Sequence, residues 1–324
     1  MTDASPAQIA GASTTERGSV AGMRILLLGY TRFALRQKTM FQSRGANATY
    51  VKRHFGLRAL PLIPLYDVVY QMGGPLVPRS VFEACKLFHK PIVKHWLGSD
   101  TLRLHDPDVQ RQCGASIVTN WADAPWLVDE LKAEGISCDV MGLSPIAATA
   151  ELPLPVAPLT VLWFLPEDRF EFYGGQMALS LARATPEVRF LFVGCERRGR
   201  PAPPNVEYLG FLNDIDLAYA RAHVLVRMPD HDGLSQMVLE ALNHGRYVIW
   251  NYPFEASLNA STEDEVEAHL NGLRQRLTTG ALGQNAAGRD FVRREYLGNV
   301  IADRICAGIA HVARTRNNGV HHRG

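Results

Sequence analysis

Long apolar runs, paired cysteines and a large net charge are all missing from this 324-residue sequence. No apolar stretch reaches the roughly 20 residues that a membrane-spanning helix needs, and the run at residues 25–28 is too short for a secretion signal. The five cysteines form no CxxC pair, which argues against a zinc site and a disulfide framework. Lysine and arginine number 34 against 32 acidic residues, which argues against a general nucleic-acid-binding protein. We therefore expect a cytoplasmic protein without a metal site or a nucleic-acid partner.

Several nucleotide-binding and hydrolytic motifs are also absent. The sequence contains no GxGxxG, no GxxxxGK[ST], no HExxH and no GxSxG. These absences argue against a dinucleotide-dependent dehydrogenase, a P-loop NTPase, a zinc metalloprotease and an α/β-hydrolase.

Short apolar runs alternate with amphipathic stretches along most of the chain. The composition is that of a globular protein, with 47% hydrophobic and 20% charged residues, and the length fits about two domains. Buried strands separated by helices are typical of parallel sheets in an α/β fold. Strands are predicted near residues 23–30, 66–74, 90–100, 114–121, 159–165, 188–194, 206–211, 222–228 and 246–250, and helices near 126–135, 174–186, 262–276 and 284–314.

A proline-rich segment without positive charge, residues 145–159, separates the two halves of this pattern. It is typical of a connector between domains. We therefore predict two Rossmann-like domains that face each other across a cleft. Their predicted bounds are 23–150 and 151–300, with a disordered leader over 1–22 and a C-terminal helix end and tail over 301–324.

The most informative segment is residues 223–250, where a strand, a polar loop and a short helix follow one another. The helix is expected to begin near Leu234 or Ser235, with Ser235 as its N-cap, and to end at Gly245. Free backbone N–H groups and the helix dipole make such a start an anion site without metal or lysine. Asp232 and Glu240 lie about 12 Å apart along the axis, so they can address opposite ends of a phosphate-bridged ligand. The plainer interpretation is a helix with one exposed glutamate and an aspartate near its start.

Residues 231–249, HDGLSQMVLEALNHGRYVI, resemble the signature of retaining glycosyltransferases of the GT-B fold, family 4, also called glycosyl transferases group 1. The shared pattern is an acid, seven residues, then Glu-Ala, a glycine and an apolar strand. Asp232 stands where that family usually has glutamate, and Glu240 occupies the second acidic position. Weaker similarity extends over most of the chain.

This resemblance implies a nucleotide-diphosphate sugar as donor substrate, with UDP or GDP as its nucleotide, and no cofactor. Glu240 would bind the ribose hydroxyls, and Asp232 would contact sugar hydroxyls as a catalytic residue. Gly233, Leu234 and Ser235 would bind the diphosphate, Phe211 and Leu212 would flank the base, and Gly29 would face the diphosphate from the other domain.

The sequence departs from the family where two cations normally stabilise the leaving diphosphate. Tyr173 stands at the expected lysine and Asp168 at the expected arginine. Arg169 is one residue away and is our candidate substitute, against the alternative of a surface arginine. Without a cation the site loses a large electrostatic contribution, and the protein would bind nucleotide with little or no turnover.

The segment HWLGSD, residues 95–100, is similar to a family strand end that often carries a histidine. Leu97 takes that position, and His95 lies two residues earlier on the same face of the strand. His95 is a catalytic candidate or else a structural histidine. Asp100 is a candidate for acceptor hydroxyls or else an N-cap.

The near-zero net charge hides a basic segment. The segment from Arg24 to Tyr66 contains eight lysines and arginines and no acidic residue. This segment is either a solvated basic face or a surface for an anionic membrane or acceptor. Arg32 and Arg36 are candidates for acceptor contacts or for reaching the donor diphosphate.

We therefore expect a retaining hexosyltransferase that moves a sugar to an acceptor hydroxyl on a carbohydrate, lipid or small molecule. It would be cytoplasmic or peripheral on the inner face of a membrane. The alternatives are an inactive nucleotide-sugar-binding scaffold and a sugar-nucleotide epimerase of the same fold.

Overall fold

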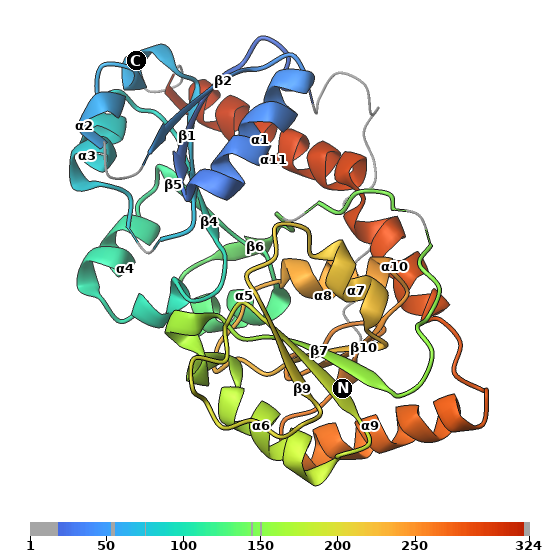
Figure 1. Ribbon diagram of the computed structural model, residues 1–324. Helices are drawn as coiled ribbons and strands as arrows, with labels where there is room; N and C mark the ends of the chain where they lie inside the picture. The colour runs from blue at the N-terminus through green and yellow to red at the C-terminus, as the bar shows by residue number, and fades with distance from the viewer. Residues whose placement is uncertain (1–18, 53–55, 75, 144, 150, 321–324) are drawn as a thin grey trace, which may run out of the picture. The chain divides into compact units, whose positions relative to one another are not determined.

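Parallel strands form two separate six-stranded sheets, each in its own unit of the chain (Figure 1). The computed structural model describes residues 19–52, 56–74, 76–143, 145–149 and 151–320. One unit comprises Met1–Leu143 with Ile301–Gly324, and the other Ser144–Val300. The predicted α/β class with two Rossmann-like parallel sheets is confirmed.

The first sheet has the order β2-β1-β3-β4-β5-β6, so the strand order reverses between β1 and β3. Gly29 ends β1 at this reversal with a φ of 132°, and a Cβ there would overlap the carbonyl oxygen of Met72 on β3. Only glycine therefore lets the two strand ends approach this closely. The strands are β1 Arg24–Gly29, β2 Asn47–Lys52, β3 Val68–Met72, β4 Ile92–Trp96, β5 Val118–Ala122 and β6 Cys138–Val140.

The last helix packs beside the first helix of this unit (Figure 1). The Cys306 Sγ atom lies 3.6 Å from Met40 Sδ, and Arg44 forms an ion pair with Asp303. None of the described helices has the length and apolar character needed to cross a membrane. The helices are α1 Thr31–Ser43, α2 Gly56–Ala59, α3 Arg79–Leu87, α4 Pro107–Cys113, α5 Pro125–Ala133 and α11 Gly298–Val320, with 3₁₀ turns at Ile63–Leu65 and Thr101–Arg103.

Part of the predicted leader is packed. Val20 is buried, and the Gly22 N–H donates to the Gly45 carbonyl oxygen at 2.9 Å. The expectation of disorder is therefore wrong for residues 19–22, because Val20 has apolar surface to bury. Residues 1–18 lie outside the described residues.

The second sheet has the order β12-β11-β10-β7-β8-β9, with its reversal between β7 and β10. One helix was expected over 284–314, but the structure has two, α10 and α11, because Leu297 adopts an extended conformation. The elements are β7 Thr160–Phe164, β8 Arg189–Val193, β9 Val206–Gly210, β10 Val224–Arg227, β11 Tyr247–Trp250, β12 Leu258–Asn259, α6 Gly175–Ala184, α7 Asp216–Arg221, α8 Gln236–Asn243, α9 Glu263–Thr278 and α10 Ala286–Tyr296, with 3₁₀ turns at Glu167–Arg169 and Glu171–Tyr173.

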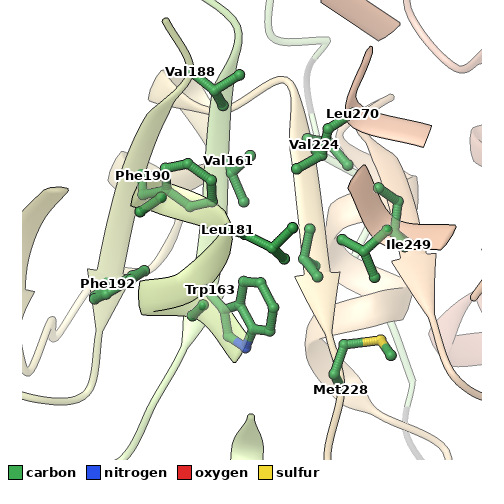
Figure 2. Close-up of a cluster of buried hydrophobic side chains, with 14 of the residues drawn as sticks. Val161, Trp163, Leu181, Val188, Phe190, Phe192, Val224, Met228, Ile249 and Leu270 are labelled. Carbon is green, nitrogen blue, oxygen red and sulfur yellow. The ribbon is translucent and has the colours of Figure 1, made fainter. Parts of the chain in front are cut away.

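Alternate residues of the second sheet build a core with α6 and α9. Figure 2 shows Trp163 of β7 and Val224 of β10 in this cluster, with Leu181 of α6 and Leu270 of α9. Because side chains alternate along a strand, Leu225 and Arg227 of β10 point to the opposite face. That face packs against α8. The topology thus directs a charged side chain toward the start of α8.

The proline-rich connector is bound to the second unit through its backbone carbonyls. Asn243 donates to the Ala147 oxygen at 2.9 Å, and Gln284 donates to the Leu152 oxygen at 3.0 Å. Arg246, which is fully buried, donates to the Pro153 oxygen at 2.9 Å. Burial lowers the pKa of Arg246 to about 10. The described part of the connector is therefore an ordered strap on this unit.

We predict that Gly29→Ala destabilises the chain by more than about 4 kcal/mol, because β1 and β3 must separate. The matched change Gly135→Ala, at a φ of 73° with open space around it, should cost only about 1–2 kcal/mol of backbone strain. Urea unfolding followed by tryptophan fluorescence measures both. Equal losses would show that close packing at the reversal is unimportant.

Candidate functional site

Two loops meet where the second sheet reverses its strand order, at the carboxyl ends of β7 and β10. In open α/β sheets, ligands bind outside the carboxyl ends of the strands at this reversal. The Asp230 N–H donates to the Phe172 carbonyl oxygen at 2.8 Å, which joins the loop after β10 to the loop after β7. The Trp163 Nε1–H donates to the Tyr173 carbonyl oxygen at 2.9 Å. Both loops are therefore fixed against the sheet.

A glycine allows this close approach. Gly174 has a φ of 78°, and a Cβ there would lie 2.9 Å from the Met228 carbonyl oxygen. Any other residue would push the two loops apart at the start of α6. The Gly-Gly pair that the sequence shows at 174–175 thus serves the geometry of the site.

Arg227 and Asp232 form a bidentate ion pair at the end of β10. The Nε and Nη2 atoms of Arg227 lie 2.5 and 3.0 Å from the two carboxylate oxygens of Asp232. The side chains are 9% and 12% exposed. Burial lowers the pKa of Arg227, but attraction and hydrogen bonding to Asp232 outweigh it, so the net shift is upward. Asp232 was expected at the site from sequence, whereas Arg227 was not.

The Tyr173 ring lies near two guanidinium groups. The Cζ atom of Arg227 is 5.1 Å from the centroid of the Tyr173 ring, and that of Arg169 is 5.5 Å away. Arg169 also lies over the Phe172 ring at 3.7 Å. Arg169 therefore lies in the loop after β7, and its guanidinium is held by two aromatic rings.

The loop before α8 is packed closely against the sheet. Gly233, Leu234 and Ser235 are all buried, and α8 begins directly after Ser235. Ser235 takes the expected N-cap position, but its side chain accepts no capping hydrogen bond. Instead its backbone carbonyl accepts from the Val238 N–H at 3.1 Å.

Glu240 is held by two donors on the partly buried face of α8 that carries Gln236. The Tyr219 hydroxyl donates to its Oε2 at 3.1 Å, and the Gln236 side chain donates to its Oε1 at 2.9 Å. Burial strongly raises the pKa of Tyr219, so this hydroxyl keeps its proton and donates. The carboxylate is thereby oriented, while its residue stays partly exposed.

Phe211 and Leu212 extend the same edge of the sheet. They follow Gly210, which ends β9 with a φ of 64°. Phe211 is 85% exposed, and Leu212 is half-buried. β9 lies three strand spacings from β10, about 14 Å along the edge. An exposed aromatic ring thus stands at the β9 end of the edge, and the Arg227–Asp232 pair lies near the middle of the edge, where the strand order reverses.

His95 is enclosed in the first unit. It is fully buried, its Nδ1 lies 2.7 Å from the Tyr70 hydroxyl, and its Nε2 lies 2.7 Å from the Met141 carbonyl oxygen. Burial lowers the pKa of His95 to about 3. With both ring nitrogens engaged, the described arrangement leaves none for a substrate, which corresponds to the structural alternative.

Asp100 holds the turn after β4. Its Oδ1 accepts from the Leu97 and Gly98 N–H groups, both at 3.0 Å, and it stands at the N-cap of the following 3₁₀ turn. Its Oδ2 lies 3.9 Å from the buried Lys94 ammonium, and burial raises the pKa of Asp100. The Asp100 side chain thus holds the backbone before the 3₁₀ turn without making a capping hydrogen bond, and the residue is buried.

The predicted residues divide between the two units. Arg169, Tyr173, Asp232 and Glu240 belong with the second sheet, while His95, Asp100, Gly29 and Arg36 belong to the first unit. Arg36 is exposed on α1, and the side chain of Arg32 lies outside the described residues. All five cysteines are free and buried. Within the described part of the chain, no group of three or more His, Cys, Asp or Glu residues is arranged to hold a metal ion.

No protein-family profile matches the sequence, and no curated protein matches it either. Solved structures are similar. HepE from Anabaena, determined with UDP-glucose, has a TM-score of 0.68 and 12% identity over 89% of this chain and all of that chain. Sucrose-phosphate synthase from Thermosynechococcus elongatus has a TM-score of 0.69 and 13% identity over 92% of this chain and all of its own. A glycosyltransferase from Rickettsia africae has a TM-score of 0.69 and 11% identity over 90% of this chain and 98% of its own.

The chain has the GT-B fold. The expected fold is thereby confirmed, with its two Rossmann-like sheets. Identities this low leave the reaction of this GT-B protein to be argued from its own residues.

The buried state of His95 predicts a pH dependence of stability. Because its pKa is about 3 in the folded chain and about 6.5 unfolded, only the unfolded chain takes up its proton between these values. Stability is therefore lost as the pH falls below about 6.5, by about 2 kcal/mol between pH 7 and pH 5.

Urea unfolding at both pH values measures this, with His95→Asn expected to lose less stability on acidification than the wild type. His311→Asn, at an exposed position on α11, is the control and should behave as the wild type does. A His95→Asn variant with an unchanged pH dependence would contradict the buried neutral imidazole.

Proposed function

We propose that this GT-B protein is a glycosyltransferase that moves a sugar from a nucleotide-diphosphate donor to an acceptor hydroxyl, with retention and without a metal ion. The observation that carries the proposal is the joined pair of loops between β7 and β10. There a fixed carboxylate, Asp232, two guanidinium groups and the start of α8 lie at one sheet edge. Structures of the same fold include one determined with UDP-glucose, which favours UDP as the nucleotide.

Glu240 is proposed to bind the ribose. Ionised carboxylates make strong hydrogen bonds to hydroxyl groups, and Tyr219 and Gln236 hold this one in a fixed orientation. Phe211 offers an exposed aromatic face on which the base can stack, with Leu212 beside it. The donor would therefore lie along the carboxyl edge of the second sheet.

The proposed reaction breaks the bond between the sugar C1 and the diphosphate oxygen, and the electron pair leaves with the diphosphate. The acceptor oxygen forms the new bond to C1 on the same face, and its proton passes to the departing phosphate oxygen. Backbone N–H groups of Gly233 and Ser235, at the positive end of α8, would bind the diphosphate. Asp232 would accept hydrogen bonds from sugar hydroxyls, and Arg169 would add positive charge.

The acceptor is proposed to bind to the first unit. Arg36 is exposed there, in a segment with no acidic residue between Arg24 and Tyr66. This charge favours an anionic acceptor or an acceptor presented at an anionic membrane face. His95 and Asp100 would support this unit from within rather than touch the acceptor.

A nucleotide-sugar-binding scaffold is the second candidate, because Tyr173 stands where the related family has a lysine. Incubation with UDP-sugars and candidate acceptors separates the two. Release of UDP that depends on acceptor supports transfer, and binding without release supports the scaffold. An isomerised sugar formed without acceptor would instead identify an epimerase.

Glu240→Ala should weaken UDP binding about 10- to 100-fold, because it removes charged hydrogen bonds to the ribose. Isothermal titration calorimetry with UDP measures this. Asp264→Ala, at an exposed position on α9, is the matched control and should leave the affinity unchanged. Unchanged affinity in Glu240→Ala, or no binding of any nucleoside diphosphate to the wild type, would refute the donor site.

A further inference from the structure

β10 ends on a buried charge after three apolar residues. Arg227 follows Val224, Leu225 and Val226, and its side chain is only 9% exposed. Burying a guanidinium is costly unless its N–H groups are paired. Here the cost is offset by Asp232, whose two oxygens take the Nε and Nη2 donors. The strand end therefore carries a fixed, permanently charged group.

The position of this charge is set by the topology. Arg227 stands at the carboxyl end of β10, beside β7, where the strand order reverses. Asp232, which fixes it, lies three residues before Ser235, the N-cap of α8. The Tyr173 ring, from the loop after β7, lies 5.1 Å from its guanidinium carbon. The group thus stands at the place where this fold opens for ligands.

Arg227 also keeps donors for a ligand. A guanidinium has five N–H groups in a fixed fork. Asp232 takes two of them, and the Tyr173 ring lies 5.1 Å from the guanidinium carbon. The remaining N–H groups suit the oxygens of a phosphate, which guanidinium groups bind with defined geometry.

We propose that Arg227 binds the diphosphate of the nucleotide donor and stabilises its charge as it leaves, with Asp232 as the positioning residue that holds the guanidinium. The inference rests on the proposed function and goes beyond it by naming a second cation, besides Arg169, that contacts the diphosphate. Arg169 is the weaker candidate, because it is half-buried over Phe172 and, among the residues that the structure describes, no carboxylate forms an ion pair that fixes its direction.

The test compares affinities for a nucleoside diphosphate and for its nucleoside, so that only phosphate contacts differ. UDP, GDP and ADP are titrated by calorimetry against uridine, guanosine and adenosine. Arg227→Gln should lose about 10- to 100-fold in affinity for the diphosphate that binds, with nucleoside affinity unchanged. Arg227→Lys, which keeps the charge, should recover part of this loss.

Two further variants separate phosphate binding from loop support. Asp232→Asn should keep a clear preference for diphosphate over nucleoside, because the cation remains. Arg274→Gln, a partly exposed position on α9 away from this loop, should match the wild type. Thermal unfolding of each variant identifies those that are folded. If Arg227→Gln does not fold, Arg227→Lys is used for the comparison instead.

The outcomes distinguish the two proposals. If the wild type binds no nucleoside diphosphate, the proposed function and this inference both fail. A second outcome is that the wild type binds a nucleoside diphosphate, but folded Arg227 variants keep their affinity for it or lose affinity for diphosphate and nucleoside to the same extent. The proposed donor site is then retained. Arg227 is then only a structural partner of Asp232, and the inference is overturned.

Discussion

β10 pairs with β7, and not with β9, which precedes it in the sequence. This pairing brings the loops after β7 and β10 side by side at the carboxyl edge of the sheet. The Asp230 N–H can then donate to the Phe172 carbonyl oxygen, and Gly174 can lie against Met228. The same closeness sets Arg227 beside the Tyr173 ring. The chemistry proposed for the second unit therefore depends on one strand pairing.

Much of the fold was predictable from sequence because buried parallel strands are apolar on both faces. The strands at 159–165 and 222–228 were expected for this reason and are present as β7 and β10. β2, Asn47–Lys52, was missed because it is an edge strand with largely half-exposed residues. The break between α10 and α11 was also missed, although Gly298 was an available signal.

The candidate site was predictable from sequence only for residues that lie close together along the chain. Asp232 and Glu240 lie near one helix, so their spacing alone relates them. Arg227 contacts Tyr173 and Tyr219 contacts Glu240 across different elements of the fold, and sequence spacing does not show such contacts. An arginine at the end of an apolar strand was nevertheless a signal that could have indicated Arg227. The two interpretations of His95 could not be separated from sequence, because every residue of β4 is buried and alternation therefore does not indicate an accessible face.

The proposed chemistry requires a nucleoside diphosphate to bind at the carboxyl edge between β7 and β10. A crystal structure of the chain with UDP would show where the nucleotide lies. We expect the diphosphate within hydrogen-bonding distance of Arg227 and of the N–H groups at the start of α8, with the base near Phe211. UDP bound elsewhere, or bound at this edge without contact to Arg227 and α8, would contradict this proposal.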